Sequence, residues 1–166
     1  MVLPDVRLLL VQFIVHEHPV GRAAQNYLAH VDLERFGLAG QREQLWLRPC
    51  QGGDYVVACL PFRVYGLALN DRVRLSEDGA TVVELLERSG HRVLRVLFTP
   101  RSDQDAFMAR ITGEVEIAGL AFEWSGKRHL AVDVPQDASP VRLFGVLQEE
   151  IDAQQAYWEW ADVEAF

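Results

Sequence analysis

The sequence predicts an α+β protein in which a β-rich amino-terminal half packs on a ferredoxin-like carboxy-terminal half. Short apolar runs separated by turn residues fill the first half, and strands alternate with two amphipathic helices in the second. No repeat, linker or charge run separates the halves, and 166 residues is the length of one ordinary domain. We therefore expect one compact unit, with residues 1–90 forming the β-rich half and residues 91–166 the ferredoxin-like half.

The first half reads as a series of short strands that suits a small barrel or a bent sheet. Val6–Val15 is a continuous apolar stretch. Two further runs, Leu45–Leu47 and Tyr55–Leu60, predict a hairpin across Gly52–Gly53, because Gly-Gly between extended runs is a strong turn signal. A two-residue turn pairs Trp46 with Cys59 and Cys50 with Tyr55. This register keeps the two thiols apart, so we expect both cysteines to be free.

The remaining amino-terminal elements follow from alternation and turn residues. The stretch from residue 19 to residue 37 fits a helix or a strand, and we favour a strand at Tyr27–Leu33. Asp71–Leu75 alternates polar and apolar residues, and a turn at Glu77–Gly79 leads into a strand at Thr81–Leu86.

The second half has the order strand, helix, strand, strand, helix, strand, which is that of a ferredoxin-like split unit. Ser102 or Asp103 can cap the first helix, and Ser139 with Pro140 opens the second. Each helix shows an apolar face: Phe107, Ile111 and Val115 in the first, and Val141, Phe144, Leu147 and Ile151 in the second. The expected strands are Arg92–Phe98, Leu120–Trp124, His129–Val134 and Tyr157–Val163. Alternation in the last strand puts Trp158 and Trp160 under the helices.

Composition and charge exclude several classes of protein. The chain is 49% hydrophobic and 24% charged, which excludes disorder, and no apolar run approaches the roughly 20 residues of a membrane span. The formal charge of −8 weighs against nucleic acid or an anionic membrane as a partner. The first apolar run has no small-residue cleavage site, so we expect a cytoplasmic protein.

A succession of short motifs resembles a family of small bacterial proteins known only as a domain of unknown function. In order, they are Leu45–Trp46, Gly53–Asp54–Tyr55, Pro61–Phe62, Gly66–Leu67, Asp71-x-Val73 and Ser89–Gly90–His91, with the ferredoxin-like half after them. The resemblance covers about residues 27–163. It implies no activity, cofactor or catalytic residue, because that family has none assigned.

The sheet face opposite the helices is a first candidate site. Alternation collects four polar side chains on it: Arg95, Glu123, His129 and Asp133. We expect a polar face that is either solvated or in contact with the other half, with an ion pair between Arg95 and Asp133. A histidine beside carboxylates can also act as a general acid or base. The candidate catalytic residues are His91, His129 and Asp133.

Two further groups complete the candidates. His16 and His18 share a face if the first strand continues to them, and His30 joins that face if the chain returns as a hairpin. Three converging imidazoles would form a zinc site with an open position. Asp71, after Asn70, is suited to accept backbone N–H bonds in a turn. Together with Arg95 and Glu123, Asp71 is a candidate binding residue.

The function that the sequence favours is a non-catalytic module that binds a protein or a small ligand, and a homodimer is one form that such a module takes. It is favoured because no phosphate-binding glycine loop, Cys-x-x-Cys pair or nucleophile elbow is present in the sequence. The alternatives are a small hydrolase or isomerase that uses histidine and carboxylate, and a histidine-rich zinc protein. Apart from that zinc, we expect no cofactor.

Overall fold

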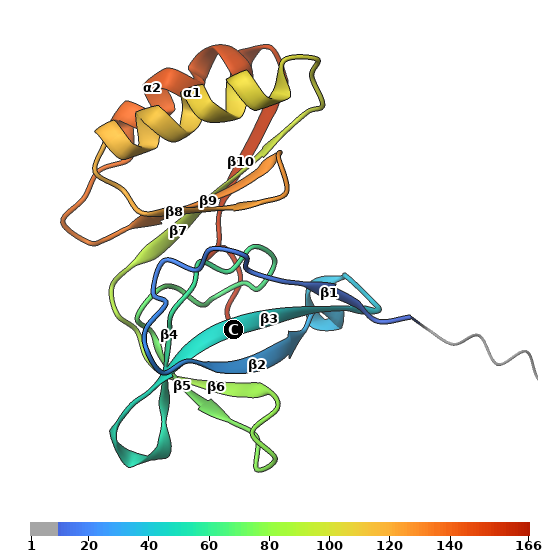
Figure 1. Cartoon of the computed structure of the whole chain (residues 1–166), viewed down its shortest axis with the longest axis vertical. Coiled ribbons are helices and arrows are strands. Elements are labelled where there is room, and N and C mark those ends of the chain that lie inside the picture. The colour runs from blue at the N-terminus through green and yellow to red at the C-terminus, as the bar shows by residue number, and fades with distance from the viewer. Residues whose placement is uncertain (1–9) are drawn as a thin grey trace, which may run out of the picture.

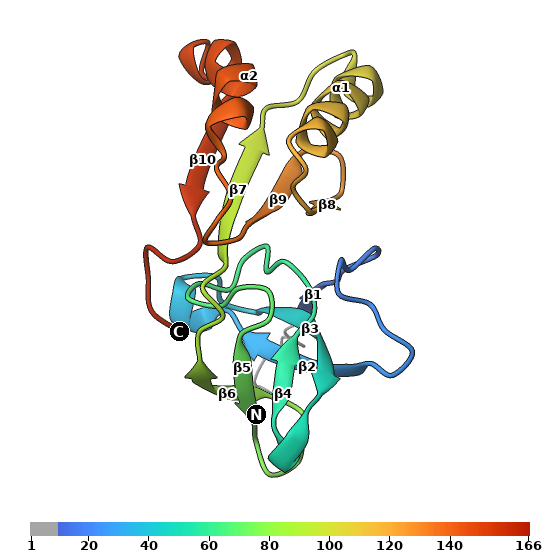
Figure 2. The same cartoon turned by 90° about the vertical axis from the view of Figure 1, so that its left-hand side faces the viewer.

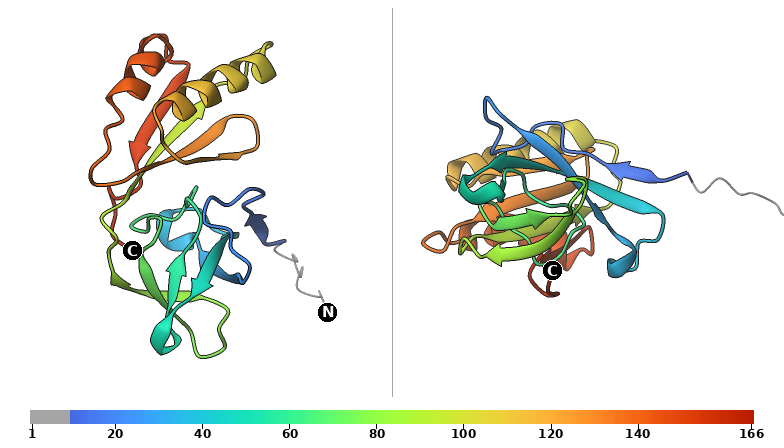
Figure 3. Two further views of the ribbon diagram at one scale, coloured as in Figure 1. Left: turned by 60° about the vertical axis from the view of Figure 1, so that its left-hand side comes forward. Right: turned by 90° about the horizontal axis from the view of Figure 1, so that it is seen from below.

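The computed structural model describes residues 10–166 and shows an α+β protein of two stacked halves (Figures 1 and 3). The lower half in Figure 1 is a curved sheet, sheet A, and the upper half is sheet B with both helices on its far face. No helix among the residues from 10 onward is long and apolar enough to cross a bilayer. Of the strand predicted for Val6–Val15, the first four residues lie outside the described part, and only Gln12–Ile14 is a strand.

Sheet A curves until its two ends meet. Its strands are β1 (Gln12–Ile14), β2 (Tyr27–Asp32), β3 (Gln41–Pro49), β4 (Tyr55–Val57), β5 (Arg72–Leu75) and β6 (Val82–Glu87), with single helical turns at Glu34–Phe36 and Gln51–Gly53. The long strand β3 pairs with β1, β2 and β4. A bridge between His30 and Thr81 joins β2 to the start of β6, so the sheet closes around its own apolar core. The strand favoured at Tyr27–Leu33 is confirmed.

The predicted hairpin register between β3 and β4 is wrong by one residue. Pro49 lies opposite Tyr55, and Cys50 donates its backbone N–H to the carbonyl of Asp54. The loop is longer than a two-residue turn because Gln51 joins the two glycines in a single helical turn, in which both glycines have positive φ. Cys50 and Cys59 are both free, as predicted.

Sheet B has the ferredoxin-like strand order predicted from the sequence. Its elements are β7 (Arg92–Phe98), α1 (Gln104–Ile117), β8 (Phe122–Ser125), β9 (His129–Val134), α2 (Val141–Asp152) and β10 (Ala156–Trp160). The order across the sheet is β10-β7-β9-β8, and every pairing is antiparallel. Figure 2 shows β10 at one edge and both helices on one face. Alternate residues of β7 and β9 pack against these helices in the upper core.

Two details of the predicted helix-covered face are wrong. Val141 is 73% exposed, and Leu143 takes its place in the core with Leu147. Trp158 remains 44% exposed because β10 is an edge strand, and its ring forms a T-shaped contact with the ring of Phe144. Trp160 packs on the upper core.

The two halves are joined by chain segments that cross between them. The segment after β1 reaches sheet B, where the backbone of Val20 binds a side chain of β8. The carboxy-terminal residue, Phe166, returns to the core of sheet A and stacks against Arg35. Gly66 has a φ of 77°, and a Cβ there would overlap the backbone nitrogen of Phe166, so this crossing requires glycine. The sheet face opposite the helices is thereby covered by the β-rich half.

Candidate functional site

A buried histidine joins the two halves through two carboxylates, and we call these three residues the His16 bridge: His16, Glu43 and Glu123. The Nδ1 atom of His16 donates to Glu123 Oε2 of β8 at 2.5 Å, and its Nε2 atom donates to Glu43 Oε1 of β3 at 3.0 Å. Because carboxylates only accept hydrogen bonds, both ring nitrogens carry protons and the imidazole is a cation. All three side chains are buried.

Backbone donors satisfy the rest of the His16 bridge. Glu43 accepts hydrogen bonds from the backbone N–H groups of Phe62, Arg63 and Val64, at 2.6 to 2.8 Å. Glu123 accepts two more through its other oxygen, at 2.9 and 3.0 Å. Buried charges are stable only when they are paired and hydrogen-bonded in this way. The bridge therefore fixes the segment after Pro61, from which Arg63 extends.

The electrostatics of the bridge favour its charged form. Burial opposes the charge on His16, but hydrogen bonds to both carboxylates hold its pKa well above the ordinary value. Burial raises the pKa of the Cys59 thiol, which is therefore neutral at pH 7, so the carboxylates supply the negative charge. Burial also opposes the charge on Glu43, yet its pKa is lowered by His16 and by backbone donors.

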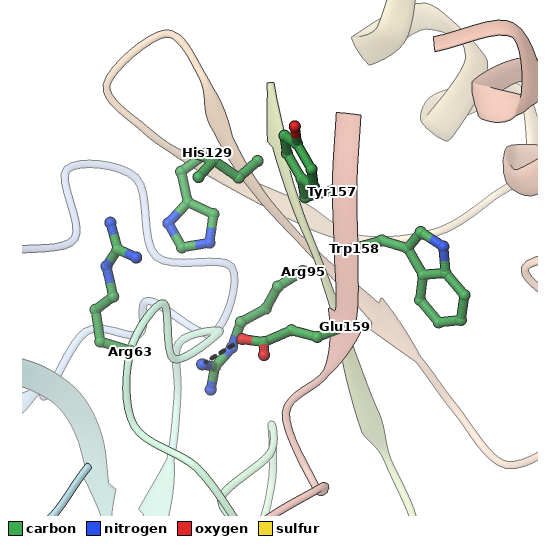
Figure 4. Close-up of a pocket in the computed structure, with 7 residues that line it drawn as sticks. Arg63, Arg95, His129, Tyr157, Trp158 and Glu159 are labelled. Carbon is green, nitrogen blue, oxygen red and sulfur yellow. Dashed lines mark hydrogen bonds and ion pairs between the residues drawn. The ribbon is translucent and has the colours of Figure 1, made fainter. Parts of the chain in front are cut away.

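A pocket of about 180 Å³ lies between the loop that carries Arg63 and the face of sheet B opposite the helices. We call it the junction pocket, and it is lined by Arg63, Arg95, Leu97, His129, Tyr157, Trp158 and Glu159. Figure 4 shows Arg63, Arg95 and His129 around one space, while the Trp158 ring lies on the other side of β10. The site thus takes side chains from both halves, with Arg63 on a loop of the first and the others on three strands of the second.

The nitrogen atoms in the junction pocket are incompletely paired. Arg95 donates to the carbonyl of Val64 and forms an ion pair with Glu159 at 3.4 Å, but its Nε atom has no partner within residues 10–166. Across the same residues, the guanidinium of Arg63 forms no hydrogen bond or ion pair, and the buried Nδ1 atom of His129 has no partner. Buried nitrogen atoms such as those of Arg95 and His129 are rarely left without a partner in folded proteins, and a bound group or an ordered water would satisfy them.

His129 is neutral in this pocket. Burial, Arg63 and Arg95 lower its pKa to about 3. A neutral imidazole carries one donor and one acceptor nitrogen, so His129 can donate to an anion without adding a third positive charge to the site.

A second arrangement brings together two of the three candidate catalytic residues. His91 Nδ1 lies 2.9 Å from both carboxylate oxygens of Asp133. Burial raises the pKa of Asp133, although His91 opposes this shift. His91 lines a separate cavity of about 170 Å³ with Gly66 and Arg92. His129, the third candidate, lines the junction pocket and takes no part in this pair.

The other predicted site residues have structural roles or stand apart. Asp71 accepts backbone N–H bonds from Ala68 and Ser89, at 2.9 and 2.7 Å, as the turn signal predicts. The ion pair predicted between Arg95 and Asp133 is not formed, because Arg95 turns to Glu159 and Asp133 to His91.

The predicted zinc ligands do not converge. The strand ends at Ile14, so His16 is buried in the bridge while His18 is exposed. His30 lies opposite Gln44, whereas Glu43, the partner of His16, lies opposite Val31 on the other face of the sheet. From residue 10 to residue 166, no group of three or more His, Cys, Asp or Glu side chains is arranged to hold a metal ion.

Glu43 and Arg63 are site residues that were not predicted from the sequence. A signal for Glu43 exists, because Glu43, Leu45 and Leu47 alternate on one face and a carboxylate among apolar positions marks a buried, paired group. No local pattern marks Arg63, whose role depends on how the loop after Pro61 meets sheet B.

Comparison with known sequences places this fold in a family. The profile of the Domain of unknown function (DUF4265) matches residues 43–160. The chain belongs to this family. The DUF4265 region includes Glu43, Arg63 and the strands that line the junction pocket, whereas His16 precedes it. This confirms the resemblance drawn from the motifs between Leu45 and His91.

One solved structure shares the fold of this DUF4265 member. It is described as the "Novel crystal structure of a hypothetical protein from Neisseria gonorrhoeae", and it superposes with a TM-score of 0.63 at 18% sequence identity. The match covers 87% of this chain and 98% of that one. No curated protein matches the chain significantly. The similarity extends to the fold and carries no activity.

Proposed function

We propose that this protein is a non-catalytic binding module whose junction pocket takes the carboxylate group of a small ligand. The observation that carries the proposal is a pair of buried, unpaired nitrogen atoms on Arg95 and His129 that lie around one cavity with the guanidinium of Arg63. A guanidinium with no ion pair in the protein is free to bind an anion. Its planar array of N–H donors matches the two oxygen atoms of a carboxylate.

The rest of the pocket supports a ligand that also has an apolar part. Leu97 and Tyr157 form its wall and are both partly exposed at its mouth. Glu159 neutralises part of the charge on Arg95, and the Tyr65 hydroxyl donates to its two oxygens at 3.0 and 2.9 Å. The free charge is therefore that of Arg63, which suits one negative group rather than two.

Benzoate and its neutral isostere benzamide test this proposal. Titration calorimetry on the full chain should detect benzoate and no comparable binding of benzamide. Arg63→Gln should weaken benzoate binding at least about 10-fold, because a hydrogen bond to a charged group contributes about 1.5–3 kcal/mol. Arg110→Gln is the matched control, since it removes the same charge from an exposed site on α1. Equal binding of benzoate and benzamide, or an Arg63→Gln variant that binds as the wild type does, contradicts the proposal.

A second candidate function is acid–base catalysis at His91. It is favoured by the hydrogen bonds between His91 and Asp133, which leave Nε2 of the imidazole as its basic nitrogen. That nitrogen forms no hydrogen bond to any of residues 10–166. A histidine oriented in this way beside a cavity can activate a water molecule.

Hydrolysis of p-nitrophenyl acetate tests this candidate. If His91 is a general base, turnover should fall at least about 100-fold in His91→Gln, which is the lower end of the usual contribution of such a group. His18→Gln, at an exposed site, serves as the control. Wild-type turnover no faster than that of His91→Gln rules out this role.

A further inference from the structure

The outer edge of β10 carries backbone groups with no partner in sheet B. Ala161 donates its N–H to Val93, and Gln155 accepts from Thr99, so odd-numbered residues of β10 point their backbone groups toward β7. The even-numbered residues of β10, of which Trp158 is the central one, therefore point their backbone N–H and carbonyl groups away from β7. Among residues 10–166, sheet B pairs β10 with β7 alone, and no hydrogen bond outside the sheet reaches the backbone N–H or carbonyl of Trp158.

This open edge borders the junction pocket. Tyr157 and Glu159 project from β10 onto the pocket face of the sheet, and Trp158 projects onto the helix face. Tyr157 is 58% exposed. A further strand added along β10 would lie next to Tyr157, and alternate side chains of that strand would face the same side as the pocket.

We propose that the natural partner is an extended peptide that adds to the edge of β10 and places an acidic side chain in the junction pocket. This proposal rests on the proposed function of the junction pocket, which is to bind a carboxylate, and identifies an acidic peptide as the molecule that carries this group. The outward groups of Trp158 supply the main-chain hydrogen bonds, and the unpaired guanidinium of Arg63 selects the acidic residue.

Charge favours an acidic peptide over a second copy of this chain on the same edge. In a symmetric antiparallel pair centred on Trp158, the partner's Glu159 would lie opposite Tyr157. That carboxylate is held within its own subunit by Arg95 and by the hydroxyl of Tyr65. A second copy therefore brings no free carboxylate for Arg63, whereas a peptide with Asp or Glu does.

Selection from a random peptide library on the immobilised full chain tests the proposal. Peptides of about eight residues are long enough to form one strand. The enriched sequences should contain Asp or Glu, and replacing that residue by its amide should weaken binding at least about 10-fold. N-methylation of one alternate set of peptide residues should abolish binding, while methylation of the other set should not, because only one set points its N–H groups toward β10.

A variant of β10 tests the edge from the protein side. Trp158→Pro removes an outward N–H and leaves the bonds to β7 in place, and proline is tolerated on edge strands. Trp158→Pro should no longer bind the selected peptides. Trp158→Phe retains the backbone N–H and should bind them as the wild type does. The alternating effect of N-methylation is independent of how well the proline variant folds.

The outcomes separate the two proposals. If the wild type binds benzoate but enriches no acidic peptide, or if the two N-methylated sets bind alike, the peptide proposal is wrong and the carboxylate pocket stands. If the wild type binds neither benzoate nor an acidic peptide, both the carboxylate pocket and the peptide proposal are wrong. If the chain is a dimer that Trp158→Pro converts to a monomer, a second copy occupies β10 and the peptide proposal is overturned.

Discussion

Replacing Glu43 by glutamine is expected to lower the free energy of unfolding by about 3–5 kcal/mol, the usual cost of breaking a buried ion pair from one side. The carboxylate accepts a hydrogen bond from His16 and three from backbone N–H groups. An amide offers only one acceptor oxygen, and its NH₂ group would face donors. The substitution also leaves His16 with a single carboxylate for its buried charge.

Urea unfolding followed by tryptophan fluorescence measures this loss. Glu84→Gln is the matched control, because Glu84 pairs with Arg74 at 2.5 Å while both side chains are about half exposed. An exposed pair contributes about 0–1 kcal/mol. If the two variants lose similar amounts of stability, the His16 bridge does not hold the halves together in the way described.

Two buried histidines are expected to make the free energy of unfolding fall on both sides of about pH 6.5, because their pKa values are shifted in opposite directions. The pKa of His129 is about 3 in the folded chain, so below pH 6.5 the unfolded chain binds a proton that the folded chain does not. Stability then falls by about 1.4 kcal/mol per pH unit as the pH decreases toward 3. The raised pKa of His16 acts above pH 6.5, where the unfolded chain has lost a proton that the folded chain keeps. Stability therefore falls again as the pH rises toward that pKa.

Urea unfolding from pH 4 to pH 9 measures both slopes. His129→Gln should remove the acid-side contribution of His129, and His16→Gln should remove the alkaline-side contribution of His16. His18→Gln should leave both slopes intact, because His18 is exposed. An acid-side slope that His129→Gln does not reduce would show that His129 is protonated in the folded chain.

The carboxy-terminal half was predictable because local signals and tertiary packing agree there. The strand Arg92–Phe98 begins and ends as predicted, and Phe107, Ile111 and Val115 are buried. The errors lie where tertiary context decides. Val141 lies about 200° around α2 from the buried Leu143 and so faces away from the core, and Trp158 fits the strand period but lies on an edge.

The candidate site was predictable only in its sheet B component. Alternation correctly placed Arg95 and His129 on the face opposite the helices, because a strand fixes which side its residues face. Their partners come from the other half. Arg63 reaches the pocket from an irregular loop, and His16 reaches the bridge after the end of a short strand, so no sequence period relates them to the sheet.

The interlocked segments also determine when the protein can fold during synthesis. His16 and Glu43 leave the ribosome early, but Glu123 follows only after about 80 further residues, and Phe166, which packs in the core of sheet A, follows later still. Until then, His16 and Glu43 lack the second carboxylate of the bridge, that of Glu123. The core of sheet A also lacks the ring of Phe166. The amino-terminal half therefore cannot complete its buried contacts until Glu123 and Phe166 have been made, and contacts of such long range slow folding and prolong exposure of apolar surface.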